Sequence, residues 1–284
     1  MNEDLRAFIE DKKGKFHCEV SPRHLAGAGD PRHITHSLRA AGWKHDGDRG
    51  LPQVSLTSPD RSLGLVLDPF SPHQAWSVGS ALMFVPGYWH AGFTRNTPVE
   101  IIAGLTDSLI RPAPAHAPPD LWETLAAAGW NASDGPHGRE ASAPGQGLKI
   151  QQFGSDKRDD DRFWWRIQAV EETYGGGVET VWSAALDQTT PTHVMAGLID
   201  ELANPAALLR GSHDQGAHYR ATEGAVFAAG PQIVEAHSAR LDAARARARA
   251  FARAAKLPSA RPHSPAPAAP AAPAAPAAAT GRSR

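Results

Sequence analysis

The sequence contains one cysteine, Cys18, in 284 residues. A single cysteine excludes a disulfide bond within the chain, and chains without disulfides are typical of a reducing cytoplasm. Apolar runs are short as well. None approaches the roughly 20 residues that a membrane-spanning helix needs, and the charged N-terminal stretch lacks the apolar core of a signal peptide. These absences predict a soluble, cytoplasmic protein.

The familiar signatures of catalysis and cofactor binding are also missing. The sequence has no Walker phosphate-binding loop, no Gly-x-Gly-x-x-Gly fingerprint, no nucleophile elbow and no zincin helix. We therefore predict no catalytic residue, no cofactor and no bound metal. A non-enzymatic binding or adaptor protein is the favoured class, with nucleic acid as the leading ligand. A protein scaffold and an enzyme of unrecognised type are the alternatives.

The best candidate for a metal site is a group of histidine and cysteine side chains near the N-terminus. Imidazole and thiolate groups suit zinc, and His33 and His36 lie one helical turn apart. The group comprises His17, Cys18, His24, His33 and His36, and its spacing matches no standard zinc motif. We interpret these residues as ordinary surface and loop side chains.

What the sequence does contain is a repeat. Residues 97–109 and 190–202 share the pattern Thr-Pro-x-x-x-x-Ala-Gly-Leu-x-Asp-x-Leu. Threonine before proline predicts a helix start, with the threonine capping free N–H groups and the proline at the first helical position. A glycine inside a helix costs about 1 kcal/mol relative to alanine. Its recurrence at Gly104 and Gly197 therefore predicts a close approach to another stretch of backbone.

The similarity extends upstream of these helices and defines two units. The matching segments are Ala41–Trp43 with Ala128–Trp130, Leu63–Leu65 with Leu148–Ile150, Trp76–Val78 with Trp165–Ile167, and Trp89 with Trp182. Alternating apolar residues and turn signals between these anchors predict antiparallel strands. We predict an α+β fold of two tandem homologous units, each an antiparallel sheet of about four strands flanked by helices, followed by a basic C-terminal helix and a disordered Pro/Ala tail.

Composition places the boundaries between these parts. The predicted parts are an N-terminal arm (1–16), a first unit (17–111), a Pro/Ala linker (112–118), a second unit (119–210), a connector with the basic helix (211–257) and the tail (258–284). Within the first unit, residues 21–30 read as a loop and a helix is expected from Asp30-Pro31 to about Ala41.

With the repeats placed, the chain resembles the actinobacterial family called domain of unknown function 317, whose members typically carry two such units. The residues that match are Ser21–Gly27 with Gly29–His33, the Ala-Gly-Trp segments, Trp89, Trp182 and both Thr-Pro helices, over about residues 17–205. The second unit lacks the Ser-Pro-Arg-His segment, so any role of that segment belongs to the first unit. The resemblance implies the two-unit fold and no particular activity.

Charge is divided unevenly along the chain. Residues 231–284 contain nine Arg and Lys against two Asp and Glu, a net charge of +7, so the remainder carries −8 of the overall −1. The predicted basic helix includes Arg245, Arg247, Arg249 and Arg253. Three interpretations stay open for it, namely a solvated helix, a contact with nucleic acid or an acidic protein surface, and a contact with a membrane surface.

A second candidate for nucleic-acid contact lies in the predicted sheet of the second unit. Trp164 and Trp165 are adjacent, so one faces the core and the other faces outward in a strand. An exposed tryptophan beside Arg162 and Arg166 suits stacking against nucleic-acid bases. The acidic remainder of the chain argues against a general groove for phosphates.

The segment after Cys18 offers a candidate anion site. Arg23, His24, Arg32 and His33 form a basic cluster beside Gly27 and Gly29, and glycine-rich backbone with nearby arginine is suited to phosphate. In the alternative interpretation Asp30 caps the following helix and the arginines are solvated.

Overall fold

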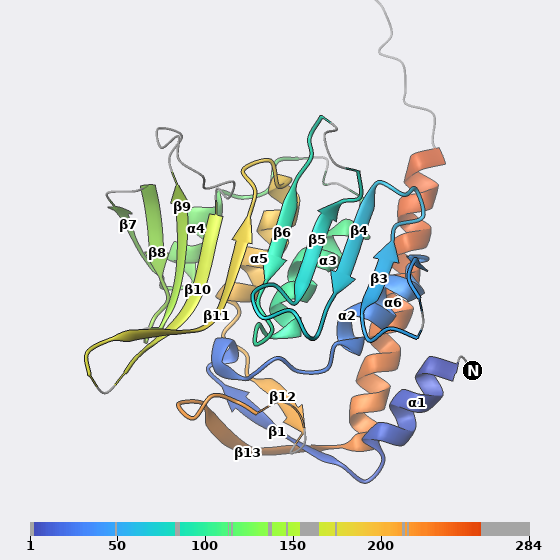
Figure 1. The fold of residues 1–284 in the computed structure, drawn as a ribbon, viewed down its shortest axis with the longest axis horizontal. Coiled ribbons are helices and arrows are strands. Elements are labelled where there is room, and N and C mark those ends of the chain that lie inside the picture. Colours follow the sequence, from blue (N-terminus) through green and yellow to red (C-terminus); the bar gives the residue numbers. More distant parts are fainter. Residues whose placement is uncertain are drawn as a thin grey trace, which may run out of the picture.

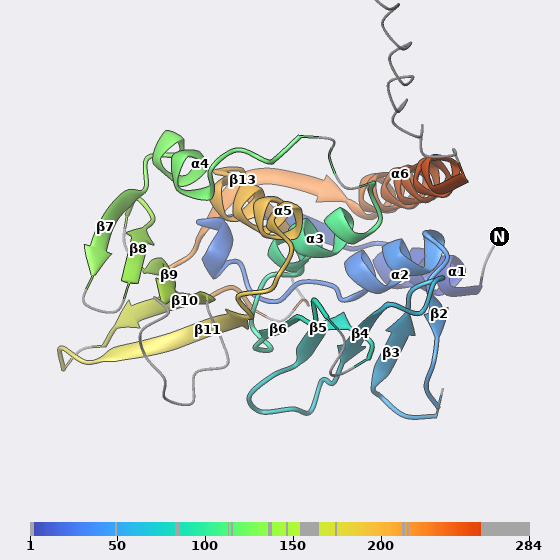
Figure 2. The same ribbon diagram turned by 90° about the horizontal axis from the view of Figure 1, so that it is seen from above.

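The computed structural model describes residues 3–256 except 49, 83–85, 113, 115, 136–137, 146, 154–164, 174, 212–213 and 215. Its centre is one antiparallel sheet in the order β2-β3-β4-β5-β6-β11-β10-β9-β8-β7. Helices α2–α5 lie on one face of this sheet (Figures 1 and 2). The two predicted units therefore share a single sheet instead of forming two.

Each unit runs helix, five strands, helix. The first comprises α2 (Arg32–Ala40), β2 (Lys44–His45), β3 (Val54–Thr57), β4 (Leu63–Leu67), β5 (Trp76–Ser80), β6 (His90–Phe93) and α3 (Val99–Leu109). The second comprises α4 (Leu121–Ala127), β7 (Asn131–Gly135), β8 (Gly138–Ser142), β9 (Leu148–Phe153), β10 (Trp165–Glu172), β11 (Val178–Leu186) and α5 (Thr192–Ala203). The predicted α+β class and the order of elements are confirmed, with one more strand in each unit than expected.

A pseudo-two-fold axis relates the units where β6 meets β11. Gly92 pairs with Ala185, and on either side Phe93 pairs with Ala184 and Ala91 with Leu186. Residue numbers 92 and 185 differ by 93, and the repeated glycines at 104 and 197 differ by the same 93. The strands and the helices thus meet about one common axis.

The glycines of the repeat lie where α3 crosses α5. A Cβ atom added to Gly104 would overlap the carbonyl oxygen of Gly197, and one added to Gly197 would overlap the carbonyl of Gly104. The predicted close approach is therefore confirmed, and its partner is the equivalent glycine of the other copy. Only glycine lets the two backbones come this near.

The repeated tryptophans occupy equivalent positions. Trp89 and Trp182 are both buried, and each lies three residues before the central Gly92–Ala185 pair. At the start of β5, Trp76 pairs with Phe93, and at the start of β10, Trp165 pairs with Leu186 in the same way. The tryptophans that the repeat places at matching positions in the sequence therefore also occupy matching positions in the sheet.

The N-terminal segment and the segment after α5 lie below the large sheet, beyond the lower ends of its strands (Figure 1). A three-stranded antiparallel sheet has β1 (Phe16–Ser21) between β12 (Leu208–Gly211) and β13 (Thr222–Ala229). Helix α1 (Glu3–Lys12) precedes β1, and helix α6 (Gly230–Lys256) follows β13 and packs against α1 and α2. The stretch interpreted as a connector therefore holds β13, which the sequence did not predict.

Two local expectations are corrected by the helix starts. Helix α3 begins at Val99 with Pro98 at its N-cap, and α5 begins at Thr192 with Pro191 at its N-cap, neither with a side-chain cap. Thr97 and Thr190 lie one residue too early to cap these helices, and both hydroxyls are buried. Asp30 likewise lies one residue before the N-cap of α2, which is Pro31, and its Oδ1 accepts a hydrogen bond of 3.0 Å from the amide of Arg32, the first residue of the helix.

Candidate functional site

The segment of residues 21–33, called the leader below, lies against both units. It continues from β1 through a short 3-10 helix, η1 (Arg23–Leu25), to the start of α2. The indole Nε1 of Trp182 donates a 2.7 Å hydrogen bond to the carbonyl of His24, and the amide of Val99 donates to the carbonyl of Ala28. The one leader thus contacts the second unit through β11 and the first through α3.

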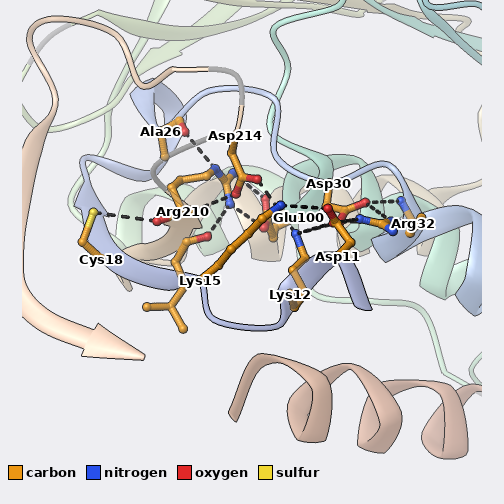
Figure 3. Close-up of polar contacts among 12 residues, drawn as sticks. Asp11, Lys12, Lys15, Cys18, Ala26, Asp30, Arg32, Glu100, Arg210 and Asp214 are labelled. Carbon is orange, nitrogen blue, oxygen red and sulfur yellow. Dashed lines mark hydrogen bonds and ion pairs between the residues drawn. The ribbon is translucent and has the colours of Figure 1, made fainter. Parts of the chain in front are cut away.

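A cluster of buried charges fixes the leader to the terminal segments (Figure 3). Arg210 on β12 forms a paired salt bridge with Glu100 on α3, at 2.7 and 2.8 Å, and donates to the carbonyls of Ala26 and Gly27. Burial alone would raise the pKa of Glu100, but the positive charge of Arg210 outweighs burial and lowers that pKa. The arginine therefore joins leader, α3 and β12 at one point.

A second charge group lies beside the first. Asp30 accepts hydrogen bonds from the Arg32 guanidinium and a 3.0 Å salt bridge from Lys12, which is 4% exposed. Burial opposes ionisation of Asp30, but Arg32 and Lys12 hold its pKa well below the usual value. Arg32 also binds Asp11, and Lys15 and Arg32 lower the pKa of Asp11 to about 2. Lys12 also lies 3.9 Å from the carboxylate of Asp214, so three cations and three carboxylates balance within this cluster.

The four residues of the predicted anion site are divided between two places. Arg32 belongs to the charge cluster, and the adjacent His33 faces a cavity of about 310 Å³ that Glu100 and His237 also line. Arg23 and His24 instead line a different cavity. Asp30 binds both the amide and the guanidinium of Arg32, so this arginine is paired with a carboxylate and not solvated as the alternative interpretation expected.

The cavity lined by Arg23 and His24 has a volume of about 420 Å³ and is called the leader cavity below. Ile101, Trp130, Leu148 and Leu202 supply apolar walls. Arg23 binds Glu201 at the end of α5 and donates a 3.2 Å hydrogen bond to the carbonyl of Ala206. A groove of about 600 Å³ adjoins this cavity, since Pro22 and Ala143 line both.

The candidate metal ligands do not converge. His17 and Cys18 are consecutive residues of β1, where Cys18 lies against the carbonyl of Arg210. His36 has its Nδ1 3.1 Å from Nε2 of His237 on α6, and His24 lies in the leader cavity. Within the described part of the chain, no group of three or more His, Cys, Asp or Glu side chains is arranged to hold a metal ion.

The described residues of the sheet predicted to stack on nucleic-acid bases do not lie together either. Trp165 is 7% exposed and stacks on Trp122 of α4, with ring centroids 5.7 Å apart, so it belongs to the core. Arg166 projects to the opposite face, with its guanidinium 5.0 Å from the ring centroid of Phe153. Arg162 and Trp164 lie outside the described residues.

The arginines of α6 fall into two sets. Arg240 and Arg247 turn inward and bind the carboxylate of Asp107 on α3, at 2.8 and 3.0 Å. Arg245, Arg249 and Arg253 follow one another at intervals of four residues and so lie along one side of the helix. Arg245 is 42% exposed on its side chain and pairs with Asp242, while Arg249 and Arg253 are exposed.

Three residues of these sites were not predicted from the sequence. Glu100 looks like an ordinary first-turn acid of a helix, Glu201 like a solvated helix residue, and Arg210 like the end of a unit. Glu100 and its partner Arg210 are 110 residues apart in the sequence, and Glu201 and its partner Arg23 are 178 residues apart. Local sequence patterns therefore give no sign of these pairs. Arg210 carried one signal, because it is a charged residue directly after the apolar run 206–209.

The fold defines a class of protein in which two homologous α+β units share one antiparallel sheet and one leader. The family model for SPDY, a domain of unknown function also called DUF317, matches residues 57–115 and 143–208. The family model thus matches one region in each unit, which is consistent with a tandem-domain protein of the DUF317 family, and the resemblance to this family inferred from the sequence is confirmed. Searches of curated proteins and of solved structures find no match. Among the described helices, none is long and apolar enough to cross a membrane.

Proposed function

We propose that this protein is a non-enzymatic nucleic-acid-binding protein of the cytoplasm that contacts phosphates through the outward arginines of α6. The observation that carries the proposal is the separation of the α6 arginines into an inward pair bound to Asp107 and an outward line of Arg245, Arg249 and Arg253. The inward pair explains how the helix is held. Among the described residues, the outward line makes no ion pair with another element, since Arg245 pairs with Asp242 of the same helix. The single cysteine supports the cytoplasmic location.

The spacing of the outward arginines suits a charged polymer. Residues four apart in an α-helix are separated by about 6 Å along the axis. Arg245, Arg249 and Arg253 thus present a row of guanidinium groups about 12 Å long. Guanidinium groups bind phosphate oxygens in a bidentate manner, so such a row follows successive phosphates of a strand.

The apolar side of α6 argues against the membrane alternative. Leu241 is 5% exposed and Ala244 is fully buried, while Ala248 packs against the core. A helix that inserts into a membrane surface needs this side free. Phe251 remains 44% exposed, but a single aromatic side chain is too little apolar area for firm insertion.

Charge reversal of the outward row tests the proposal. The variant Arg245→Glu/Arg249→Glu/Arg253→Glu is compared with Arg6→Glu/Arg95→Glu/Arg111→Glu, whose three arginines are exposed elsewhere and whose change in net charge is the same. Binding is measured by fluorescence anisotropy with a short DNA duplex and a single-stranded oligonucleotide of arbitrary sequence. We expect the α6 variant to weaken binding by at least about tenfold and the control to change it little.

Two results would contradict the proposal. Equal losses in the two variants would mean that net charge alone governs binding. If neither probe binds the unaltered chain, nucleic acid is not the ligand, and recovery of an acidic protein from native lysate treated with nuclease would then favour the scaffold alternative.

A further inference from the structure

Two buried nitrogen atoms of the leader lack hydrogen-bond partners among the described residues. They are Nε of Arg23 and Nε2 of His24, on consecutive residues of η1. The Arg23 side chain is 11% exposed and His24 is 8% exposed. A buried polar group that makes no hydrogen bond costs about 1–3 kcal/mol, so both atoms favour a bound partner. Both residues line the leader cavity.

The charges of the leader cavity cancel. The guanidinium of Arg23 faces the carboxylate of Glu201, which is its ion-pair partner. His24 adds no charge near neutral pH, because burial lowers its pKa to about 4. An anion entering the cavity would therefore meet a neutral pair and not an excess of positive charge. The cavity offers hydrogen bonds to an uncharged ligand instead.

The shape and walls of the cavity add a second requirement. A volume of about 420 Å³ lies within the range typical of small-molecule sites. The walls include the indole of Trp130 and the side chains of Ile101 and Leu202, which present apolar surface to a flat ring. The adjoining groove of about 600 Å³ is lined by polar residues that include Lys149 and Glu171, so it provides room for a hydroxylated group.

We propose that the leader cavity is a binding site for a nucleoside, with the planar uncharged base against its apolar walls. The polar edge of the base pairs with Nε of Arg23 and Nε2 of His24, and the sugar extends past Pro22 into the adjoining groove. The His24 ring lies toward this junction, since a Cβ atom added to Gly147 of the groove would be 3.8 Å from its Nε2. This inference rests on the cavity alone and does not depend on the arginines of α6.

Two substitutions test separately the hydrogen bond from Arg23 and the free volume of the leader cavity. Arg23→Lys keeps a positive charge opposite Glu201 but removes the Nε–H donor. Ala203→Trp, at the last residue of α5, places a large side chain in the cavity. Ala126→Trp on the exposed side of α4 is the matched control, because Ala126 does not line the cavity.

The test is calorimetric titration of the full chain with adenosine, guanosine, cytidine and uridine, and with benzoate as a planar anion. We expect saturable binding of at least one nucleoside, about tenfold or more weaker in Arg23→Lys, lost in Ala203→Trp and unchanged in Ala126→Trp. A short single-stranded oligonucleotide identifies the source of the base. Loss of its binding in Ala203→Trp means that the base belongs to a strand, and binding of nucleosides alone means a free ligand.

Three outcomes would overturn the inference. The unaltered chain binds no nucleoside, or it binds benzoate more tightly than every nucleoside, or Ala203→Trp keeps full nucleoside affinity. Circular dichroism of each variant shows whether it is folded. If Arg23→Lys does not fold, Ala203→Trp with its control decides the question.

Discussion

The buried ion pair between Arg210 and Glu100 attaches the terminal segments to the leader. Arg210 is 4% exposed and has five hydrogen bonds to Glu100, Leu209, Ala26 and Gly27. A buried charge is tolerated because its partner is present, and removing one partner of a buried pair costs about 3–5 kcal/mol. The stability of this region therefore depends on the pair and not on either residue alone.

Replacement of Arg210 tests this dependence. Arg210→Met leaves the Glu100 carboxylate buried without its cation, so we expect the free energy of unfolding to fall by about 3–5 kcal/mol in urea denaturation. The double variant Glu100→Leu/Arg210→Met contains no unpaired charge and should lose less than the single one. A loss below about 1 kcal/mol in Arg210→Met would be expected only of an exposed pair and would contradict the assignment.

Buried histidines give the fold a dependence on pH. Burial lowers the pKa of His24 to about 4, and burial with nearby positive charge lowers the pKa values of His33 and His237 to about 4 as well. In the unfolded chain these groups have pKa values near 6.5. Between pH 6.5 and 4 the unfolded state therefore binds protons that the folded state does not, and the free energy of unfolding decreases as the pH falls.

The size of this effect is measurable by urea denaturation at pH 7 and pH 5. Each of the three histidines contributes at most about 1.4 kcal/mol per pH unit. His237→Phe, which replaces one imidazole beside Phe8, should reduce the slope against pH. Equal stability at the two pH values would show that these imidazoles bind protons in the folded state as readily as in the unfolded one.

At the scale of elements, the crossing of α3 and α5 joins the two copies. Alanine favours a helix over glycine by about 1 kcal/mol, so Gly104→Ala and Gly197→Ala would stabilise an isolated helix. In the folded chain each added methyl group overlaps the backbone of the other helix. We expect each variant to lose about 1–3 kcal/mol of unfolding free energy.

The control for this prediction is Gly175→Ala, where an added Cβ meets no neighbour within 4 Å. It should leave stability nearly unchanged. Because both glycines act at one contact, the losses in Gly104→Ala/Gly197→Ala should be less than additive. Additive losses, or a gain in either single variant, would place the helices further apart than the structure has them.

The elements themselves are largely predictable from the sequence, and the reason is local. The strands β3 and β4 follow from alternating apolar residues on either side of the turn at Pro59-Asp60, and α6 follows from its alanine and arginine content. The sharing of one sheet was not predicted, because β6 and β11 carry no local sign of their partner. Their central residues, Gly92 and Ala185, are small, but many other residues of the chain are small too.

The whole molecule combines an acidic, pseudo-symmetric body with an asymmetric part, which consists of the leader and the terminal segments. The second copy has no leader, and α6 packs beside α1 and α2 of the N-terminal half (Figure 2). The candidate sites lie in this asymmetric part, and the sequence indicated each only in part. Arg23 with His24 and the α6 arginines were visible as basic clusters, but their division into paired and outward residues depends on Asp107 and Glu201, which lie far away in the sequence.

The salt dependence of nucleic-acid binding tests the proposed function most directly. Each phosphate contact contributes about 0.9 to the slope of log affinity against log salt concentration on duplex DNA. If Arg245, Arg249 and Arg253 each contact a phosphate, neutralising all three by substitution with glutamine should reduce the magnitude of this slope by about 3. The same slope in the glutamine variant and the unaltered chain would contradict the proposed contact.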